Sequence, residues 1–261
     1  MNLGQIKERI RMLKLDGKEC ISNFYYRAED NEKEYQVWSG EHSLIFSYEK
    51  LGINQVYFIS NDEEELRRGL SLLPKNSVIH LISKDKEVGE EWSKRLGYPL
   101  YSIYGRFGYS LGTLEIETKR FAENKLDRFY DDRFGVFATN ADLNDIQKII
   151  FETFDVNCDV LFTDAEMEKL IQNKNVWIEK ENGEICTLFI YRIEGKKYYA
   201  NLAVNRSTAD ILYSIQKKSI LQEIQEHNVT YFYGWQSLTN MQATRKHGFP
   251  EFDLYNLIFK R

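Results

Sequence analysis

The chain has 261 residues, of which 43% are hydrophobic and 29% charged, and its formal net charge is −5. This length suits two domains of ordinary size, and the apolar fraction excludes a disordered or low-complexity chain. The acidic balance argues against a broad nucleic-acid-binding face.

Three cysteines and the N-terminal stretch bear on the compartment. Cys20, Cys158 and Cys186 are widely spaced, which predicts free thiols rather than a disulfide framework or a metal site. Residues 1–17 resemble a charged amphipathic helix and lack the apolar core of a signal peptide. No window approaches the run of about 18 apolar residues typical of a spanning helix. We therefore expect a cytoplasmic protein with no metal cofactor, no membrane contact and no nucleic-acid partner.

Two pairs of segments recur in the same order along the chain. Residues 39–52 (SGEHSLIFSYEKLG) resemble residues 182–195 (NGEICTLFIYRIEG), and residues 93–99 (SKRLGYP) resemble residues 244–250 (TRKHGFP). The offsets, 143 and 151 residues, differ by eight. We therefore expect a duplicated domain whose second copy has eight additional residues after the strand that follows the first segment.

The duplication suggests a domain organisation. We expect one domain at 1–115, a charged connector at 116–133 and a second domain at 134–261. Within the second domain the patterns predict a strand, two helices, a three-strand antiparallel meander, a helix, a strand, a helix and a closing strand at its end. Thr163, with Glu166 three residues later, predicts a capping box at the start of the second helix.

This order of elements resembles the GNAT superfamily of acyl-CoA N-acyltransferases. The resemblance rests on residues 137–146 (FATNADLNDI), on the meander ending at 202–204 (LAV) with its following helix, and on residues 245–249 (RKHGF). The first half resembles the family more faintly, through residues 90–103 (EEWSKRLGYPLYSI). The implied fold is α+β, with two GNAT-like domains, each a mostly antiparallel twisted sheet flanked by helices, and the N-terminal copy degenerate.

The resemblance also implies a binding site for acetyl-CoA or another acyl-CoA. Pantetheine would lie along the strand at 198–204 and bond to the main chain of Leu202, Ala203 and Val204. The pyrophosphate would lie at the N-terminus of the next helix, where free N–H groups favour anions. The residues at that place are Arg206, Ser207, Thr208, Ala209, Asp210, Ile211 and Leu212. They lack the glycines of the family's phosphate loop, so Ser207 or Thr208 could instead serve only as a helix cap.

Further assignments follow from the same resemblance. Ser237 and Asn240 would lie near the CoA, and Thr244 occupies the place of a tyrosine that protonates the CoA thiolate in many members. Tyr233, Tyr231 and Tyr255 are alternative acids, and Glu184, Glu179 and Asp253 are candidate bases. In the first copy, residues 62–65 (DEEE) replace the phosphate loop, which predicts that this copy does not bind CoA.

The predicted function is transfer of an acyl group, with acetyl expected, from acyl-CoA to a primary amine of a small molecule or peptide. The protein would act as a monomer or homodimer. Because the loop glycines and the tyrosine are missing, an inactive GNAT-like binding or regulatory protein is the alternative. A third class, an aminoacyl- or peptidyl-transferase of the same fold, is disfavoured by the acidic net charge.

Overall fold

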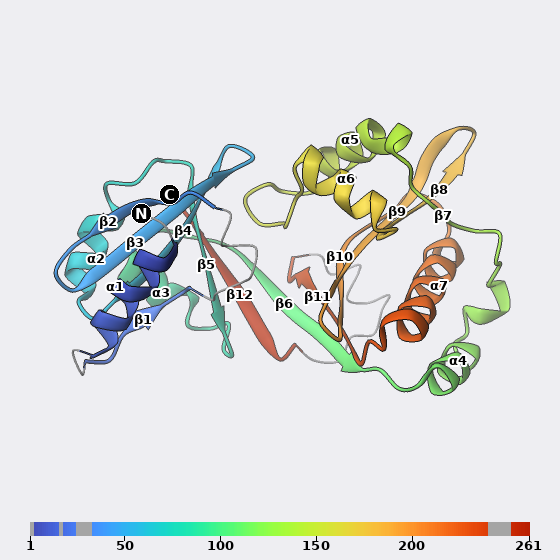
Figure 1. The fold of residues 1–261 in the computed structure, drawn as a ribbon, viewed down its shortest axis with the longest axis horizontal. Coiled ribbons are helices and arrows are strands. Elements are labelled where there is room, and N and C mark those ends of the chain that lie inside the picture. The colour runs from blue at the N-terminus through green and yellow to red at the C-terminus, as the bar shows by residue number, and fades with distance from the viewer. Residues whose placement is uncertain (1–2, 16–17, 25–32, 240–251) are drawn as a thin grey trace. The chain divides into compact units, whose positions relative to one another are not determined.

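The computed structural model describes residues 3–15, 18–24, 33–239 and 252–261. The chain forms two compact units, unit 1 (Met1–Gly105 with Ser237–Arg261) and unit 2 (Arg106–Gln236). Each unit has a mixed α/β fold with a mostly antiparallel sheet and helices packed on it, as the sequence predicts (Figure 1).

Unit 1 contains its elements in the following order. They are α1 (Leu3–Leu15), β1 (Ile21–Ser22), β2 (Gln36–Ser39), β3 (Ser43–Lys50), β4 (Ile53–Ser60), α2 (Glu63–Leu70), β5 (Ser77–Ser83), α3 (Gly89–Leu96), the first part of β6 (Leu100–Ser110), and β12 (Leu254–Lys260). The sheet order in this unit is β2-β3-β4-β5-β12-β6, and β1 also pairs with β4. Strands β3 and β4 are antiparallel, whereas β4 and β5 are parallel.

The sheet of unit 1 has helices on both faces because side chains alternate along its strands. Val56 and Phe58 of β4 pack in one core with residues of α2 and α3. Ile59 points to the other face and packs in a second core with Ile6 of α1. All three side chains of β4 are at most 2% exposed, so strand β4 is buried on both faces.

Unit 2 follows the end of β6. Its elements are α4 (Leu114–Ala122), η2 (Asp127–Phe129), β7 (Val136–Phe137), η3 (Asn140–Asp142), α5 (Leu143–Thr153), α6 (Asp164–Gln172), β8 (Val176–Glu181), β9 (Glu184–Glu194), β10 (Lys197–Asn205), α7 (Ala209–His227) and β11 (Tyr231–Ser237). The sheet order is β6-β11-β10-β9-β8-β7. The predicted meander is confirmed as β8, β9 and β10, and the predicted capping box of Thr163 and Glu166 begins α6.

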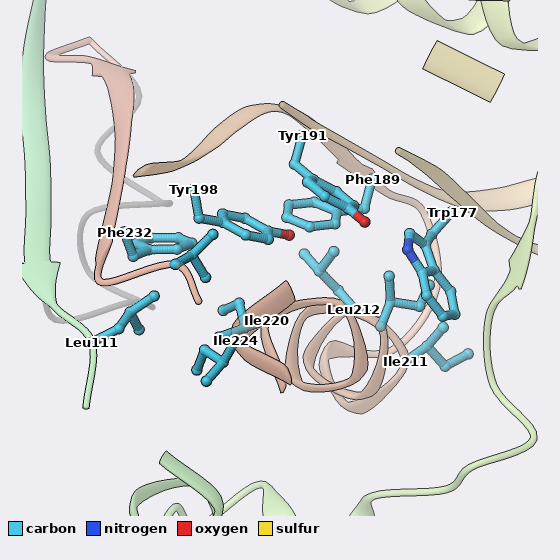
Figure 2. Close-up of a cluster of buried hydrophobic side chains, with 12 residues drawn as sticks. Leu111, Trp177, Phe189, Tyr191, Tyr198, Ile211, Leu212, Ile220, Ile224 and Phe232 are labelled. Atoms are coloured by element: carbon cyan, nitrogen blue, oxygen red, sulfur yellow. The ribbon is translucent and has the colours of Figure 1, made fainter. Parts of the chain in front are cut away.

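An aromatic layer between the sheet and α7 forms the core that supports this unit. The rings of Tyr191 and Tyr198 stack with centroids 4.6 Å apart, and Phe232 stacks on Tyr198 at 5.5 Å. Leu212 and Ile220 of α7 lie in the same cluster (Figure 2). Complete burial of such a side chain contributes about 1.5–3 kcal/mol, so this layer fixes α7 against the sheet. Helices α5 and α6 lie on the other side of this sheet (Figure 1).

The two copies differ in the helix that joins their parallel strands. Asn54 pairs with Ser77, 23 residues later, whereas Lys197 pairs with Tyr231, 34 residues later. The second copy therefore has eleven additional residues here, not the eight that the repeat offsets predict. Helix α2 has 8 residues and α7 has 19, so the whole difference lies in the helix. The later repeat segment, 244–250, falls outside the described residues.

The observed units differ from the predicted domains at both ends of the second domain. Strand β12, expected to close that domain, pairs antiparallel with β5, with Leu257 opposite Leu81 in the core of unit 1. The predicted connector packs on α7 instead of bridging two domains. Tyr213 donates a hydrogen bond to the carbonyl of Phe121 (2.9 Å), and the Lys217 ammonium lies 2.5 Å from Asp127. The residues from α4 to η2 are therefore part of unit 2.

The aromatic layer also contains a buried carboxyl, which makes the stability of unit 2 depend on pH. Glu223 of α7 is 3% exposed, and Tyr191 donates a hydrogen bond of 2.6 Å to it. Burial raises the pKa of Glu223, and the Tyr191 hydroxyl and His227 oppose this only in part. The folded chain therefore holds the proton more tightly than the unfolded chain, and the contribution of this group to stability falls as pH rises through its folded pKa.

We expect Glu223→Gln to raise the melting temperature at pH 7 by about 2–4 °C. The amide keeps an acceptor for Tyr191 and removes a buried charge. The gain should shrink as pH falls towards 4, where the wild-type carboxyl is protonated. Calorimetry across this range measures both values. Glu168→Gln, at an exposed position of α6 in the same unit, is the matched control and should show no such trend. A melting temperature below wild type at pH 7 for Glu223→Gln would contradict the assignment.

Candidate functional site

A β-bulge in β10 opens the sheet of unit 2. The pairing of β10 with β9 shifts register between Ala200 and Leu202, which leaves Asn201 as the extra residue. A bulge bends its strand and increases the local twist. The parallel pairing of β10 with β11 extends only to Ala200 opposite Gly234. Beyond this pair the two strands separate, and we call the space between them the slot.

Beside the slot, one edge of β10 has no strand partner among the described residues. From Leu202 to Asn205 this strand still pairs with β9, but no described strand pairs with its other edge. The side chains of Leu202 and Val204 are buried, whereas Ala203 is exposed. An extended chain that carries amide groups can bond to such a free strand edge. The structure thus presents Leu202, Ala203 and Val204 chiefly through their backbone.

At the end of the slot, a short loop leads into α7. The side chain of Asn205 shapes this loop: its Oδ1 accepts hydrogen bonds from Ser207 N (3.1 Å) and Thr187 Oγ1 (3.0 Å), and its Nδ2 donates to Thr208 O (3.0 Å). Thr208 is the N-cap residue of α7, and its side chain makes no capping hydrogen bond among the described residues. The amides of the first turn are therefore left to another acceptor, which favours an anion there.

The charges at this helix end are mixed. The guanidinium of Arg206 lies 3.7 Å from the carboxylate of Glu152, and both side chains are about half exposed. An ion pair this exposed contributes little to stability, so Arg206 is available to an incoming anion. Asp210 lies in the first turn and opposes one. Ile211 and Leu212 are buried in the aromatic layer, so the absence of glycine here reflects helix packing (Figure 2).

The corresponding helix in unit 1, α2, is capped differently at its N-terminus. Asp62 is the N-cap of α2, and its carboxylate accepts a hydrogen bond of 2.9 Å from Glu65 N. That hydrogen bond holds the pKa of Asp62 below its usual value, as expected for a carboxylate beside free amides. The chain's own anion thus occupies the place that α7 leaves open.

A second set of side chains lies beside the bulge, on the sheet face opposite α7. The rings of Tyr199 and Tyr233 stack at 4.7 Å, and the Tyr233 hydroxyl donates to Glu194 (2.6 Å). Arg192 lies over the ring of Tyr199 at 5.1 Å, and its Nε donates to Asn201 Oδ1 (3.1 Å). We call these five residues the bulge cluster. It connects the start of the slot to a carboxylate.

Burial and the adjacent carboxylate of Glu194 raise the pKa of Tyr233 well above its usual range. Tyr233 therefore keeps its proton at neutral pH and donates it in a hydrogen bond to Glu194. Sequence reasoning proposed Tyr233 but missed Glu194 and Arg192. These residues can be found only from their positions in the sheet. Arg192, Tyr199 and Tyr233 lie side by side on three neighbouring strands, and this arrangement is visible only when the strand registers are known.

The structure does not bring Glu184 to the bulge cluster. Glu184 and Glu194 begin and end the same strand, so they lie about 33 Å apart along it at the usual rise of about 3.3 Å per residue. Ser237 ends β11 and shares a hydrogen bond of 2.7 Å with Thr239. The predicted residues Asn240 and Thr244 fall outside the described residues.

Neither a metal site nor a membrane span is found in the part of the chain that the structure describes. No group of three or more His, Cys, Asp or Glu side chains there could hold a metal ion. None of the described helices is long and apolar enough to cross a bilayer.

No protein-family profile and no curated protein matches this sequence, but solved structures resemble it. A GCN5-related N-acetyltransferase from Sphaerobacter thermophilus superposes with a TM-score of 0.51 at 10% identity, covering 85% of this chain and 81% of that one. A tandem GNAT protein from the clavulanic acid biosynthesis pathway gives 0.52 at 9%, covering 84% and 78%. A probable N-acyltransferase from Enterococcus faecalis V583 gives 0.51 at 12%, covering 100% and 69%.

These likenesses concern the fold alone. They show that the chain has the GNAT fold. The bulged strand, its separating parallel partner and the helix between them are the parts of this fold that form the candidate site.

The last residue pair before the slot yields a stability prediction. A Cβ on Gly234 would lie 2.6 Å from the Phe107 ring and 3.1 Å from the carbonyl oxygen of Ala200. We expect Gly234→Val to lower the free energy of unfolding of unit 2 by about 1–3 kcal/mol, as overpacking does. Chemical denaturation measures the change. Ala203→Val, at an exposed position of β10, should stay within about 0.5 kcal/mol, and equal losses in the two variants would contradict this account of the slot.

Proposed function

We propose that unit 2 binds acyl-CoA, with acetyl-CoA the expected co-substrate, and transfers its acyl group to a primary amine of a small molecule or peptide. The observation that carries the proposal is the continuity of two features. The slot beside β10 leads directly to the uncapped N-terminus of α7. A free strand edge suits the amides of pantetheine, and the helix end suits a pyrophosphate.

In this proposal the main chain from Leu202 to Val204 holds the pantetheine. Ser207, Thr208 and the amides of Ala209 to Leu212 receive the pyrophosphate, with Arg206 supplying a positive charge. The thioester then lies near the bulge, where a main-chain N–H of β10 stabilises the oxyanion that forms when an amine attacks the carbonyl. The C–N bond forms, the C–S bond breaks, and the CoA thiolate takes up a proton.

The bulge cluster supplies the groups for proton transfer. Glu194 is held by the hydroxyl of Tyr233 and lies 3.4 Å from the Arg192 guanidinium. We assign Glu194 to accept the proton that the amine loses, and we assign Tyr233 to orient the carboxylate of Glu194. Glu184, the base suggested by the resemblance, is too far along β9 to share this centre. Thr244, Ser237 and Asn240 remain assignments from the resemblance.

A non-catalytic binding protein is the second candidate. The observation in its favour is the first turn of α7, where Asp210 opposes an anion and the buried Leu212 occupies the loop position at which the resembled family has its central glycine. Binding of acetyl-CoA with no release of free CoA thiol over a broad panel of amines would favour this candidate.

Acetyl-CoA binding can be measured without knowing the acceptor. At a concentration one hundred times the dissociation constant, a ligand that binds only the folded chain adds roughly 2.7 kcal/mol to its stability. We expect acetyl-CoA to raise the melting temperature accordingly, and adenosine, which lacks both pyrophosphate and pantetheine, to raise it far less. The absence of a shift with acetyl-CoA, propionyl-CoA and free CoA would refute the proposed function.

The charges at the start of α7 predict opposite effects on affinity. Arg206→Ala should weaken acetyl-CoA binding about threefold to tenfold, because one exposed charge near a phosphate contributes on the order of 1 kcal/mol. Asp210→Asn should strengthen it about twofold to fivefold by removing a like charge. Titration calorimetry measures both, and Arg128→Ala, on η2, is the control expected to bind like wild type. If Arg206→Ala and Arg128→Ala bind equally well, Arg206 has no such role.

A further inference from the structure

Strand β1 of unit 1 occupies an unusual place in its sheet. Ile21 pairs with Ser60 and Ser22 with Ile59, both of β4. Strand β3 already pairs with the whole of β4 along its other edge. Strand β1 therefore lies on the edge of β4 that faces β5. Strands β4 and β5 pair only from Asn54 opposite Ser77 to Val56 opposite Ile79. Strand β1 thus lies where these parallel strands separate, the position of the slot in unit 2.

The residue after β1 anchors it to both walls of this space. The side-chain carboxamide of Asn23 donates hydrogen bonds to the carbonyls of Val56 in β4 (2.9 Å) and His80 in β5 (3.1 Å). Its Oδ1 accepts a hydrogen bond from Phe58 N (2.7 Å). Asn23 is only 3% exposed. Three hydrogen bonds to a buried carboxamide make this anchor specific, since each unpaired partner would cost about 1–3 kcal/mol.

The chemistry of this anchor corresponds to that of the ligand proposed for unit 2. Pantetheine carries two amide groups, and an amide that lies between two separating strands offers them one N–H donor and one carbonyl acceptor. The walls of unit 1 satisfy the carboxamide of Asn23 through the same kinds of group, accepting two hydrogen bonds from its Nδ2 and donating one to its Oδ1. Just beyond the end of β4 that pairs with β1, Asp62 provides the carboxylate that fills the N-terminus of α2. Both parts of an acyl-CoA site are thus present in unit 1, and both are occupied by the chain.

We infer that unit 1 retains the acyl-CoA slot of its fold and that its own strand β1, anchored by Asn23, fills that slot in place of pantetheine. The unit is closed to acyl-CoA, and the chain binds one acyl-CoA rather than two. The closure of unit 1 rests on its own contacts, whereas the count of one per chain also rests on the function proposed for unit 2.

Hydrogen–deuterium exchange on the full-length chain tests the inference in the wild type. Acetyl-CoA should slow exchange in peptides that cover residues 200–212 and leave residues 18–24 and 54–60 unchanged. Native mass spectrometry should find one acetyl-CoA per chain. Slower exchange at 54–60 on adding acetyl-CoA, or two bound molecules, would overturn the inference. No effect at 200–212 would instead refute the function proposed for unit 2.

An anchor variant tests the closure without any ligand. Asn23→Ala should speed exchange at 18–24 and 54–60 by at least about tenfold, because the strand loses its contacts to both walls. Residues 200–212 should exchange as in wild type, which also reports that the chain has folded. Asn76→Ala is the matched control, because its carboxamide bonds to Gly52 O in the same unit (2.6 Å) at the other end of β4. Unchanged exchange at 54–60 in a folded Asn23→Ala would overturn the closure.

Discussion

The candidate site depends on a parallel strand pair that stops pairing partway along its length. In unit 2, one extra residue in β10 shifts the register with β9, and β11 pairs no further than Gly234. A sheet that continued to pair there would satisfy its own backbone and bind nothing. Interrupting it leaves donors and acceptors for a ligand, and the aromatic layer under α7 keeps the helix end in line with the gap. The cost of the interruption is offset by that packing.

The two units show two outcomes of the same architecture. Each has a parallel pair that separates and a helix that begins beside it. In unit 2 the described residues leave the strand edge and the helix end without protein partners. In unit 1 the chain supplies a strand, a carboxamide and a carboxylate of its own. The β3–β4 pairing also lacks the bulge seen in β10. The loss of a site in one copy is thus explained by added contacts as well as by missing residues.

Local sequence patterns predicted the features that depend on local interactions. The meander, the capping box at Thr163 and the strand-to-helix passage at 202–212 follow from periodicity, caps and turns. The α+β fold of two units was instead implied by the duplication and by the resemblance to a family. Features that depend on distant pairing were not predictable in this way. The bulge cluster needs the register of three strands. The strand that pairs with β12 depends on which sheet has a vacant edge. The alternation of buried and exposed side chains along β12 suits either unit. The repeat offsets also predicted eight extra residues in the second copy, whereas the structure has eleven in the helix between the parallel strands. The offsets give only the net difference in chain length between the two repeated segments, and they do not show where along the chain residues are gained or lost.

The pairing of β12 with β5 has a consequence for how the protein folds during synthesis. Asn256 contacts His80 across 176 residues of sequence, so unit 1 lacks an interior strand until the whole of unit 2 has been made. Contacts so distant in sequence form slowly. The first unit to begin emerging from the ribosome is therefore the last to be completed, and until then β5 presents an unpaired edge that can aggregate. We expect unit 2, which is continuous in sequence once β6 has been made, to fold before unit 1 receives its final strand.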